Sequence, residues 1–148
     1  MYKRQIYIAW SKYNRSALLR IPAATPQGTR FEYRPSDGSC NVYLSFAALI
    51  YAGLDGVLNE EQLPPPVESN IYKLTEKERS RMGIGKLPSN LAEALVELEN
   101  DEVIKEALAP LTPKYLAAKW REWNEYSYKV HEWERERYLE ESYPYMEV

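Results

Sequence analysis

The sequence predicts an α+β fold that is mainly helical, with a small antiparallel sheet of two or three strands. Two observations lead to this prediction. Short β-branched and aromatic runs fall near the N-terminus, and the later segments carry the three- and four-residue apolar spacing of helices. The chain has 148 residues, of which 45% are hydrophobic, and this is enough for one domain with its own core. Residues 1–148 are therefore expected to form a single domain.

Three runs in the N-terminal part are typical of β-strands, namely residues 6–10, 16–21 and 29–34. Pro22 ends the second run, because proline cannot donate to a sheet ladder. The connections between the runs are short. Short connections favour antiparallel neighbours, so the three runs predict one small antiparallel sheet.

The third run has a charged face and an aromatic face. Because side chains alternate along a strand, Arg30, Glu32 and Arg34 share one face, and Phe31 and Tyr33 share the other. The aromatic face is expected in the core.

The charged face of this strand has two interpretations. Two guanidiniums beside a carboxylate can hold anionic oxygens and a divalent cation side by side, since arginine makes forked contacts to phosphate and glutamate oxygens suit Mg²⁺. The alternative is a solvated charge ladder on an ordinary antiparallel strand.

Helical patterns follow the strands. Residues 41–52 are apolar on almost every side, which predicts a buried helix that ends at Gly53. A short polar helix is expected to begin at Thr75, where Glu78 completes a capping box, and to end at Gly83.

Three further helical regions complete the chain. Asn90 and Glu93 form the capping box of the first, which is expected to break near residues 100–101 before Pro110 stops it. The second begins at the Thr112-Pro113 pair and runs to about residue 128. The last covers roughly residues 133–141.

Composition excludes several classes of function. The net charge of −3 gives no electrostatic footprint for nucleic acid. No apolar run approaches a membrane span, and the N-terminus lacks a signal-peptide pattern, so a cytoplasmic protein that does not bind membranes is expected. The single cysteine, Cys40, excludes an intrachain disulfide and a CxxC metal site.

Several motifs resemble those of glutamine synthetase, in the order in which that family carries them. Residues 14–22 resemble its Asn-Arg-Ser-Ala-x-x-Arg-Ile-Pro motif, and residues 30–34 its Arg-x-Glu-x-Arg strand. The remaining similar segments are residues 41–44, 52–56, 70–72, 87–95 and 133–138. The resemblance is closest to the C-terminal third of the prokaryotic type I enzymes. The family's N-terminal β-grasp domain and upstream catalytic region are not matched.

The resemblance implies an ATP-dependent ligase that makes glutamine from glutamate and ammonia through γ-glutamyl phosphate, with ATP and Mg²⁺ as cofactors. It implies that Arg15, Arg20 and Arg30 contact phosphates and that Arg34 lies near the γ-carboxyl and phosphoryl groups. It also implies that Glu32 is a metal ligand. This assignment agrees with the chemistry, because phosphoryl transfer relies mainly on positioning and charge neutralisation.

Departures from the family pattern bear on catalysis. The family's other metal-binding glutamates and its metal-binding histidine lie upstream of the matched region, so Glu32 makes an incomplete metal site. Lys3 stands where the family has its proton-accepting glutamate, and a lysine is cationic at neutral pH. His131 is expected to be a surface or helix-packing residue. Tyr72 matches a tyrosine that some members adenylylate, but a packed loop tyrosine is the expectation here.

Two functions follow from this resemblance. In the first, the chain is inactive alone, holds no cofactor alone, keeps a residual anion-binding arginine cluster, and has a regulatory or subunit-interaction role in nitrogen metabolism. In the alternative, it is one part of a split glutamate–ammonia ligase that needs a second chain. Self-association or association with glutamine synthetase subunits is expected in either case. The aromatic anchors proposed for it are Trp120, Trp123, Trp133, Tyr138, Tyr143 and Tyr145.

Overall fold

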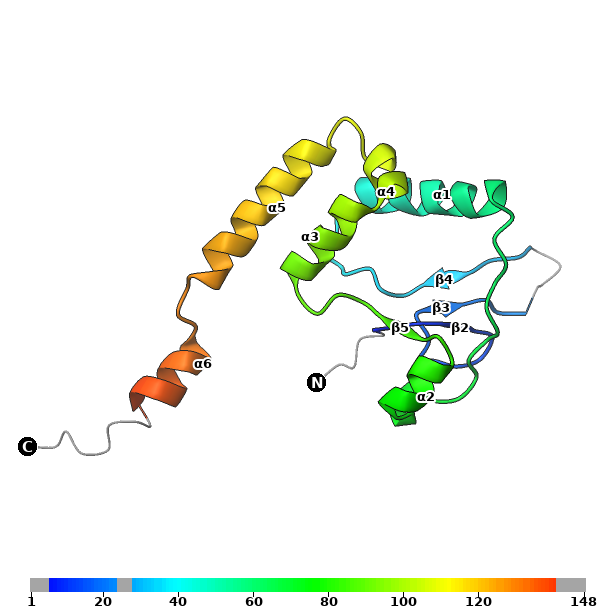
Figure 1. Cartoon of the computed structure of the whole chain (residues 1–148), viewed down its shortest axis with the longest axis horizontal. Coiled ribbons are helices and arrows are strands. Elements are labelled where there is room, and N and C mark those ends of the chain that lie inside the picture. The colour runs from blue at the N-terminus through cyan, green and yellow to red at the C-terminus, as the bar shows by residue number, and fades with distance from the viewer. Residues whose placement is uncertain (1–5, 24–27, 141–148) are drawn as a thin grey trace, which may run out of the picture.

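The computed structural model describes residues 6–23 and 28–140 (Figure 1). Its strands are β1 (Tyr7–Ile8), β2 (Trp10–Ser11), β3 (Leu19–Arg20), β4 (Glu32–Tyr33) and β5 (Gly85–Lys86). Its helices are α1 (Val42–Leu58), η1 (Ile71–Lys73), α2 (Glu76–Arg81), α3 (Leu91–Asn100), α4 (Glu102–Ala107), α5 (Thr112–Ser127), α6 (Glu132–Arg135) and η2 (Glu136–Glu140). The predicted α+β class, mainly helical with small sheets, is confirmed.

Two small sheets form the β part. Strands β1 and β5 pair antiparallel, and the second sheet has the order β2-β3-β4. Strands β3 and β4 pair antiparallel with Arg20 opposite Glu32. Strands β2 and β3 pair parallel, which corrects the purely antiparallel arrangement expected from the sequence.

The parallel pair is possible despite its short connection because the strands are so short. Each contributes two residues, so the loop of residues 12–18 must carry the chain back by only about 7 Å. The loop turns at once, since the Ser11 hydroxyl donates to the carbonyl of Asn14 at 3.0 Å. A short connection therefore does not dictate antiparallel pairing here.

The helix boundaries follow the predicted caps closely. The Thr75 side chain accepts from the backbone N–H of Glu78, and the Glu78 carboxylate accepts from the Thr75 backbone, so the capping box of α2 is present. Asn90 caps α3. The predicted break falls at Asp101, which caps α4. Thr112 differs from its expected role as a cap, because it lies within α5 and its hydroxyl donates to the carbonyl of Lys105 at 2.7 Å.

Helix α1 is longer and more exposed than the sequence predicts. It continues through Gly53, since one glycine costs a helix only about 1 kcal/mol relative to alanine. None of its residues is buried, and Tyr43 and Phe46 are 83% and 63% exposed. The expected buried helix is thus wrong for this structure, because α4 packs against α1 while the described residues leave most of its apolar surface uncovered.

An open apolar groove of about 720 Å³ lies between α1 and the segment that carries β4. Phe31 and Tyr33 line one side, and Phe46 and Leu49 of α1 line the other. Phe31 is 59% exposed and Tyr33 41%, so their predicted place in the core is wrong. They do share one strand face, but nothing among the described residues fills the space between that face and α1.

The buried core lies at the other end of the sheets and is small. Ala17, Val67 and Ile71 form it, and Ile71 is fully buried with its N–H donating to the Ser16 hydroxyl at 3.0 Å. The backbone N–H of Val67 donates to the carbonyl of Trp10, so residues 64–71 return to the edge of β2. The partly buried side chains packed around this core are Tyr7, Ala9, Leu74 and Ile84.

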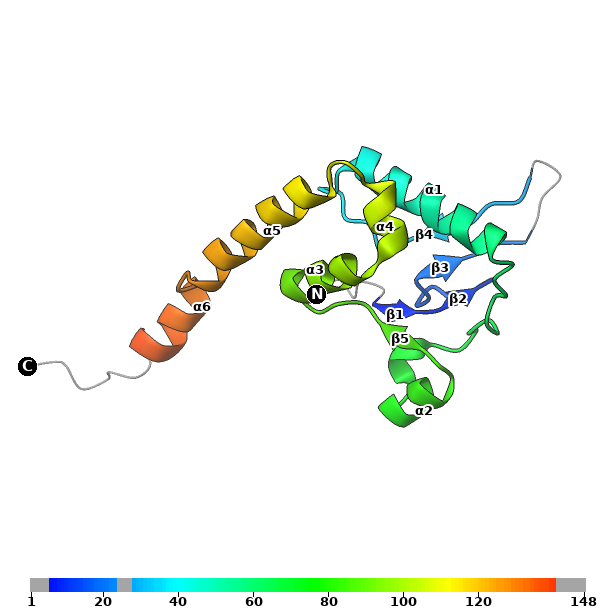
Figure 2. The same cartoon turned by 45° about the horizontal axis from the view of Figure 1, so that its top comes forward.

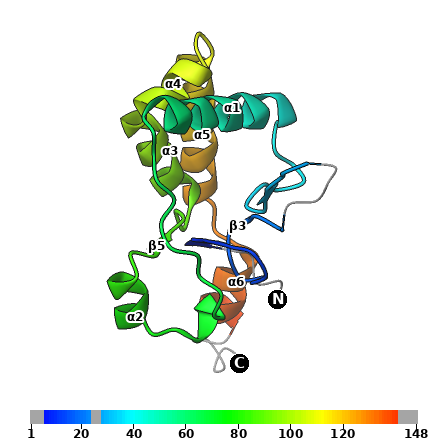
Figure 3. The same cartoon turned by 90° about the vertical axis from the view of Figure 1, so that its right-hand side faces the viewer.

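The helices surround the sheets unevenly. Helix α1 lies on one side of them and α2 on the other, as Figure 3 shows. Helix α5 packs on α3, with the Trp120 indole donating to the Glu99 carboxylate at 2.7 Å, and α6 extends beyond α5 away from the sheets (Figures 1 and 2). Each helix in the part of the chain that the structure describes is too short or too polar to cross a membrane.

Candidate functional site

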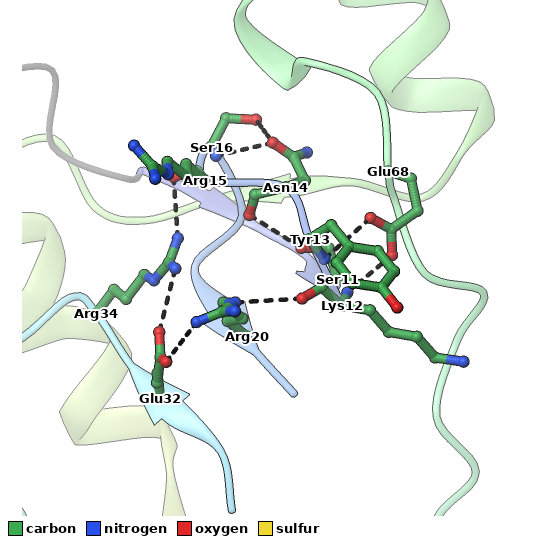
Figure 4. Close-up of polar contacts among 10 residues, drawn as sticks. All are labelled: Ser11, Lys12, Tyr13, Asn14, Arg15, Ser16, Arg20, Glu32, Arg34 and Glu68. Carbon is green, nitrogen blue, oxygen red and sulfur yellow. Dashed lines mark hydrogen bonds and ion pairs between the residues drawn. The ribbon is translucent and has the colours of Figure 1, made fainter. Parts of the chain in front are cut away.

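The charged face predicted on the third strand forms an ion-pair network around Glu32 (Figure 4). One guanidinium nitrogen of Arg20 lies 2.6 Å from one Glu32 oxygen, and one of Arg34 lies 3.2 Å from the other. Strand pairing explains the first contact, since Arg20 and Glu32 are opposite residues of β3 and β4. Strand alternation explains the second, because Glu32 and Arg34 point to the same side.

Each guanidinium has a second anchor on the loop of residues 12–18. The Nε of Arg20 donates to the carbonyl of Lys12 at 3.2 Å, and an Nη of Arg34 donates to the carbonyl of Arg15 at 3.0 Å. Both side chains are therefore held at two points, one carboxylate and one carbonyl. They present their remaining N–H donors in a fixed direction, which is the arrangement that phosphate and carboxylate ligands need.

The arginines hold Glu32 in its ionised form. The hydrogen bond from Arg34 is the main cause that lowers the pKa of Glu32 below its ordinary value of 4.5, and the charges of Arg20 and Arg34 add to it. Partial desolvation of the carboxyl opposes this shift in pKa without reversing it.

The structure gathers three of the four predicted arginines. Arg20 and Arg34 pair across Glu32, and the backbone of Arg15 joins the network while its side chain is exposed. Arg30 is exposed and lies outside the network. It precedes β4, where the chain is not paired as a strand, so alternation no longer fixes its direction.

The donor set around Glu32 does not fit Mg²⁺. Both carboxylate oxygens accept from guanidiniums, whereas a magnesium ion requires about six oxygen ligands, several of them from carboxylates, water or phosphate. Within residues 6–23 and 28–140, no group of three or more His, Cys, Asp and Glu side chains lies close enough to hold a metal ion. In this conformation Glu32 orders two arginines, and it is a single carboxylate that belongs to no such group of ligands among the described residues.

The other residues singled out by the sequence lie away from this network. His131 is the residue that precedes α6, where its backbone N–H donates to Glu134 at 2.9 Å and its ring packs on Tyr126 with centroids 4.5 Å apart. This matches the expected packing role. Tyr72 is half-buried, with its ring 5.4 Å from that of Tyr7. Lys3 lies outside the described residues.

Two residues of the site had no role in the sequence prediction. Asn14 belongs to the motif at residues 14–22 but carries no charge, so the search for anion-binding groups passed over it. No sequence pattern around Glu68 indicates a role for this residue. In the structure Asn14 lies in the loop whose carbonyls anchor the arginines and contacts Val67 and Ser69, 53 and 55 residues away. Glu68 contacts Lys12 and Tyr13 of the same loop, 56 and 55 residues away (Figure 4).

Comparison with known proteins gives one consistent family. The model of the family described as "Glutamine synthetase, catalytic domain" matches residues 1–138. The glutamine synthetase of Thermotoga maritima is 48% identical over 139 residues, which cover 93% of this chain and 32% of that protein. The glutamine synthetase of Methanocaldococcus jannaschii is 45% identical, with 93% of this chain and 31% of that protein covered. The chain thus spans about a third of the length of these relatives.

Solved structures agree with the sequence comparison. The structure "GmaS/ADP complex-Conformation 1" superposes with a TM-score of 0.78 at 31% identity, covering 93% of this chain and 30% of that one. The structure "Apo GmaS without ligand" gives a TM-score of 0.75, also at 31% identity, covering 91% and 30%.

The ion pairs of Glu32 predict a pH-dependent contribution to stability. Because the folded-state pKa of Glu32 is lowered, its contribution is present above pH 4.5 and is lost as the pH falls through the lowered pKa. Thermal unfolding of Glu32→Gln should therefore show a lower Tm than the unmodified chain at pH 7 and a smaller deficit in Tm at pH 3. Glu122→Gln is the matched control, since its pair with Lys119 is an exposed helix pair worth little. An equal deficit of Glu32→Gln at both pH values would contradict the prediction.

Proposed function

Because the chain belongs to the glutamine synthetase catalytic-domain family, we propose that it supplies that fold's phosphate-binding arginines and acts by associating with other chains. It has no ligase activity alone, and its role in nitrogen metabolism is regulatory or one of subunit interaction. The pairing of Arg20 and Arg34 across Glu32 carries the proposal. It sets two guanidiniums side by side with further N–H donors available to an anion.

A bound nucleotide in a relative supports an ATP phosphate as the family ligand of these arginines. The GmaS complex with ADP is one of the structures on which most of this chain superposes. The arginines of the present chain offer charge and forked donors to such a phosphate. Glu32 opposes binding, because an incoming anion competes with it for the same guanidiniums, and this makes the expected affinity low.

The cluster should bind phosphate weakly and in a salt-sensitive manner. Titration with inorganic phosphate or ATP is expected to give millimolar or weaker binding, since exposed charges are screened over about 10 Å at 0.1 M salt. The double variant Arg20→Ala, Arg34→Ala should abolish it, and Arg121→Ala on the exposed face of α5 should leave it unchanged. Binding that survives the double variant would place the anion site elsewhere.

The open apolar groove favours the alternative function, in which the chain is one part of a split ligase. Relatives three times as long have further chain with which to cover α1 and the β4 segment. A second chain could do the same and bring the metal-binding residues that the described donor set lacks. A coupled assay separates this alternative from the first proposal.

The pure chain should form no glutamine from ATP, glutamate and ammonia, because Glu32 alone does not hold a catalytic metal ion. The same assay with a partner chain co-purified from the native cell should also be negative if the role is regulatory. Activity in the mixture that Glu32→Gln abolishes would establish the split ligase. Activity of the pure chain that Glu32→Gln abolishes would contradict both functions.

Self-association is the simplest form of the proposed interaction. Trp133 and Tyr138 of the α6–η2 segment are 65% and 60% exposed, with ring centroids 6.2 Å apart in a T-shaped pair. Exposed aromatic clusters are common interface anchors. Trp120 and Trp123 are half-buried on α5, while Tyr143 and Tyr145 lie outside the described residues.

Light scattering at micromolar concentration should therefore detect an oligomer. Trp133→Ala with Tyr138→Ala should weaken it, because both aromatic side chains are mostly exposed and available to a partner. Lys77→Ala with Arg81→Ala, two exposed side chains on α2, is the matched control and should have little effect. A monomer that also fails to bind added glutamine synthetase would remove the support for this interaction.

A further inference from the structure

The loop that anchors the arginines is itself held by a distant segment of the chain. Residues 12–18 lie against residues 64–71, which return to the edge of β2. The indole N–H of Trp10 donates to the carbonyl of Pro64 at 2.6 Å, and the N–H of Val67 donates to the carbonyl of Trp10 at 2.9 Å. These contacts fix the start of the loop.

Asn14 lies in the loop and uses one end of its side-chain amide to bind the distant segment and the other to bind the loop itself. Its Nδ2 donates to the carbonyls of Val67 and Ser69, at 2.9 and 2.5 Å. Its Oδ1 accepts from the backbone N–H and the hydroxyl of Ser16, at 2.8 and 2.7 Å. The Ser16 hydroxyl accepts in turn from the N–H of Ile71 in the buried core. Asn14 thereby uses its amide as a bridge with four hydrogen bonds.

Glu68 holds the other side of the loop from the same segment. One carboxylate oxygen accepts from the backbone N–H of Lys12 at 2.8 Å, and the other accepts from that of Tyr13 at 3.2 Å. A carboxylate that binds two consecutive backbone amides fixes the direction of the peptide planes between them. The carbonyl of Lys12 is in one of those planes, and it accepts from Arg20.

These hydrogen bonds connect residues 67–71 to the loop of residues 12–18, and further hydrogen bonds connect the loop to the arginines. The carbonyls of Lys12 and Arg15 anchor Arg20 and Arg34, as described above. Without the hydrogen bonds of the Asn14 and Glu68 side chains, the loop would no longer hold these two carbonyls in place, and each guanidinium would keep Glu32 as its only described anchor.

We propose that Asn14 and Glu68 are positioning residues of the arginine site: they hold the loop carbonyls that direct Arg20 and Arg34 toward an anion. This inference rests on the proposed phosphate binding, and it assigns one neutral and one acidic side chain a role in binding an anion. A role confined to folding is the competing explanation, and the two differ in what they predict for Glu68→Gln.

The charge of Glu68 makes the test unusually direct. Removing a negative charge beside an anion site strengthens anion binding if only the field of the protein matters. Loss of positioning acts in the opposite direction. Glu68→Gln should weaken inorganic phosphate binding by about tenfold, the lower end of the range found when the groups that orient metal ligands are removed. It should also shift the ¹⁵N–¹H NMR signal of the Arg20 Nε without phosphate present.

Glu78→Gln is the matched control. The Glu78 carboxylate also accepts two hydrogen bonds, from the N–H and hydroxyl of Thr75, but it does so in the α2 capping box outside the arginine network. It should lower the Tm while leaving both the phosphate affinity and the Arg20 signal unchanged. Asn14→Ala, compared with Asn90→Ala at the start of α3, repeats the test with no change of charge and decides it should Glu68→Gln not fold.

Each outcome has one reading. Weaker phosphate binding and a shifted Arg20 signal in Glu68→Gln and Asn14→Ala, absent from the controls, support the inference. Unchanged or tighter phosphate binding in a folded Glu68→Gln, with the Arg20 signal in place, overturns it. An unmodified chain that binds no phosphate defeats the proposed function instead, and the Arg20 signal then still decides whether Asn14 and Glu68 orient the guanidinium.

Discussion

The sheet region depends on one return of the chain, which brings residues 64–71 back to the loop after β2. The same return buries Ile71 against Ala17 and satisfies the amide of Asn14. The buried core and the charged network around Glu32 are therefore both held in place by residues 64–71. Because the buried core is small, hydrogen bonds contribute a large part of the stability of this region. A buried or partly buried donor that is left unpaired costs about 1–3 kcal/mol.

Glu32 has two opposing effects on the arginines. It holds Arg20 and Arg34 at the same carboxylate, whereas two like charges would repel each other without it. It also occupies donors that an anion would use. The proposed anion site would therefore be ordered before an anion binds, but the negative charge of Glu32 would reduce the attraction of the two arginines for that anion.

The local sequence pattern predicted many of the helix starts and strand faces of this chain. It did not predict which segments pack against them. Alternation placed Glu32 with Arg34, and capping residues placed the starts of α2 and α3. The same alternation put Phe31 and Tyr33 on one face but could not say what covers that face, because covering depends on elements distant in sequence. The roles of Asn14 and Glu68 were also not predicted, because Asn14 carries no charge and the contacts of both residues join positions more than fifty residues apart.

The long span of these contacts has a consequence for the order in which the chain folds. Helices form from neighbours in sequence, whereas the contact of Asn14 with Ser69 closes a loop of 55 residues. The length-dependent entropy of such a closure is roughly 3.5 kcal/mol, and it must be met before the local hydrogen bonds are gained. Long-range contacts of this kind slow folding, because the entropy of closure is met before the contacts are gained. A partly folded chain with every helix intact would thus still lack the hydrogen bonds of Asn14 and Glu68 that hold the loop carbonyls beside Arg20 and Arg34.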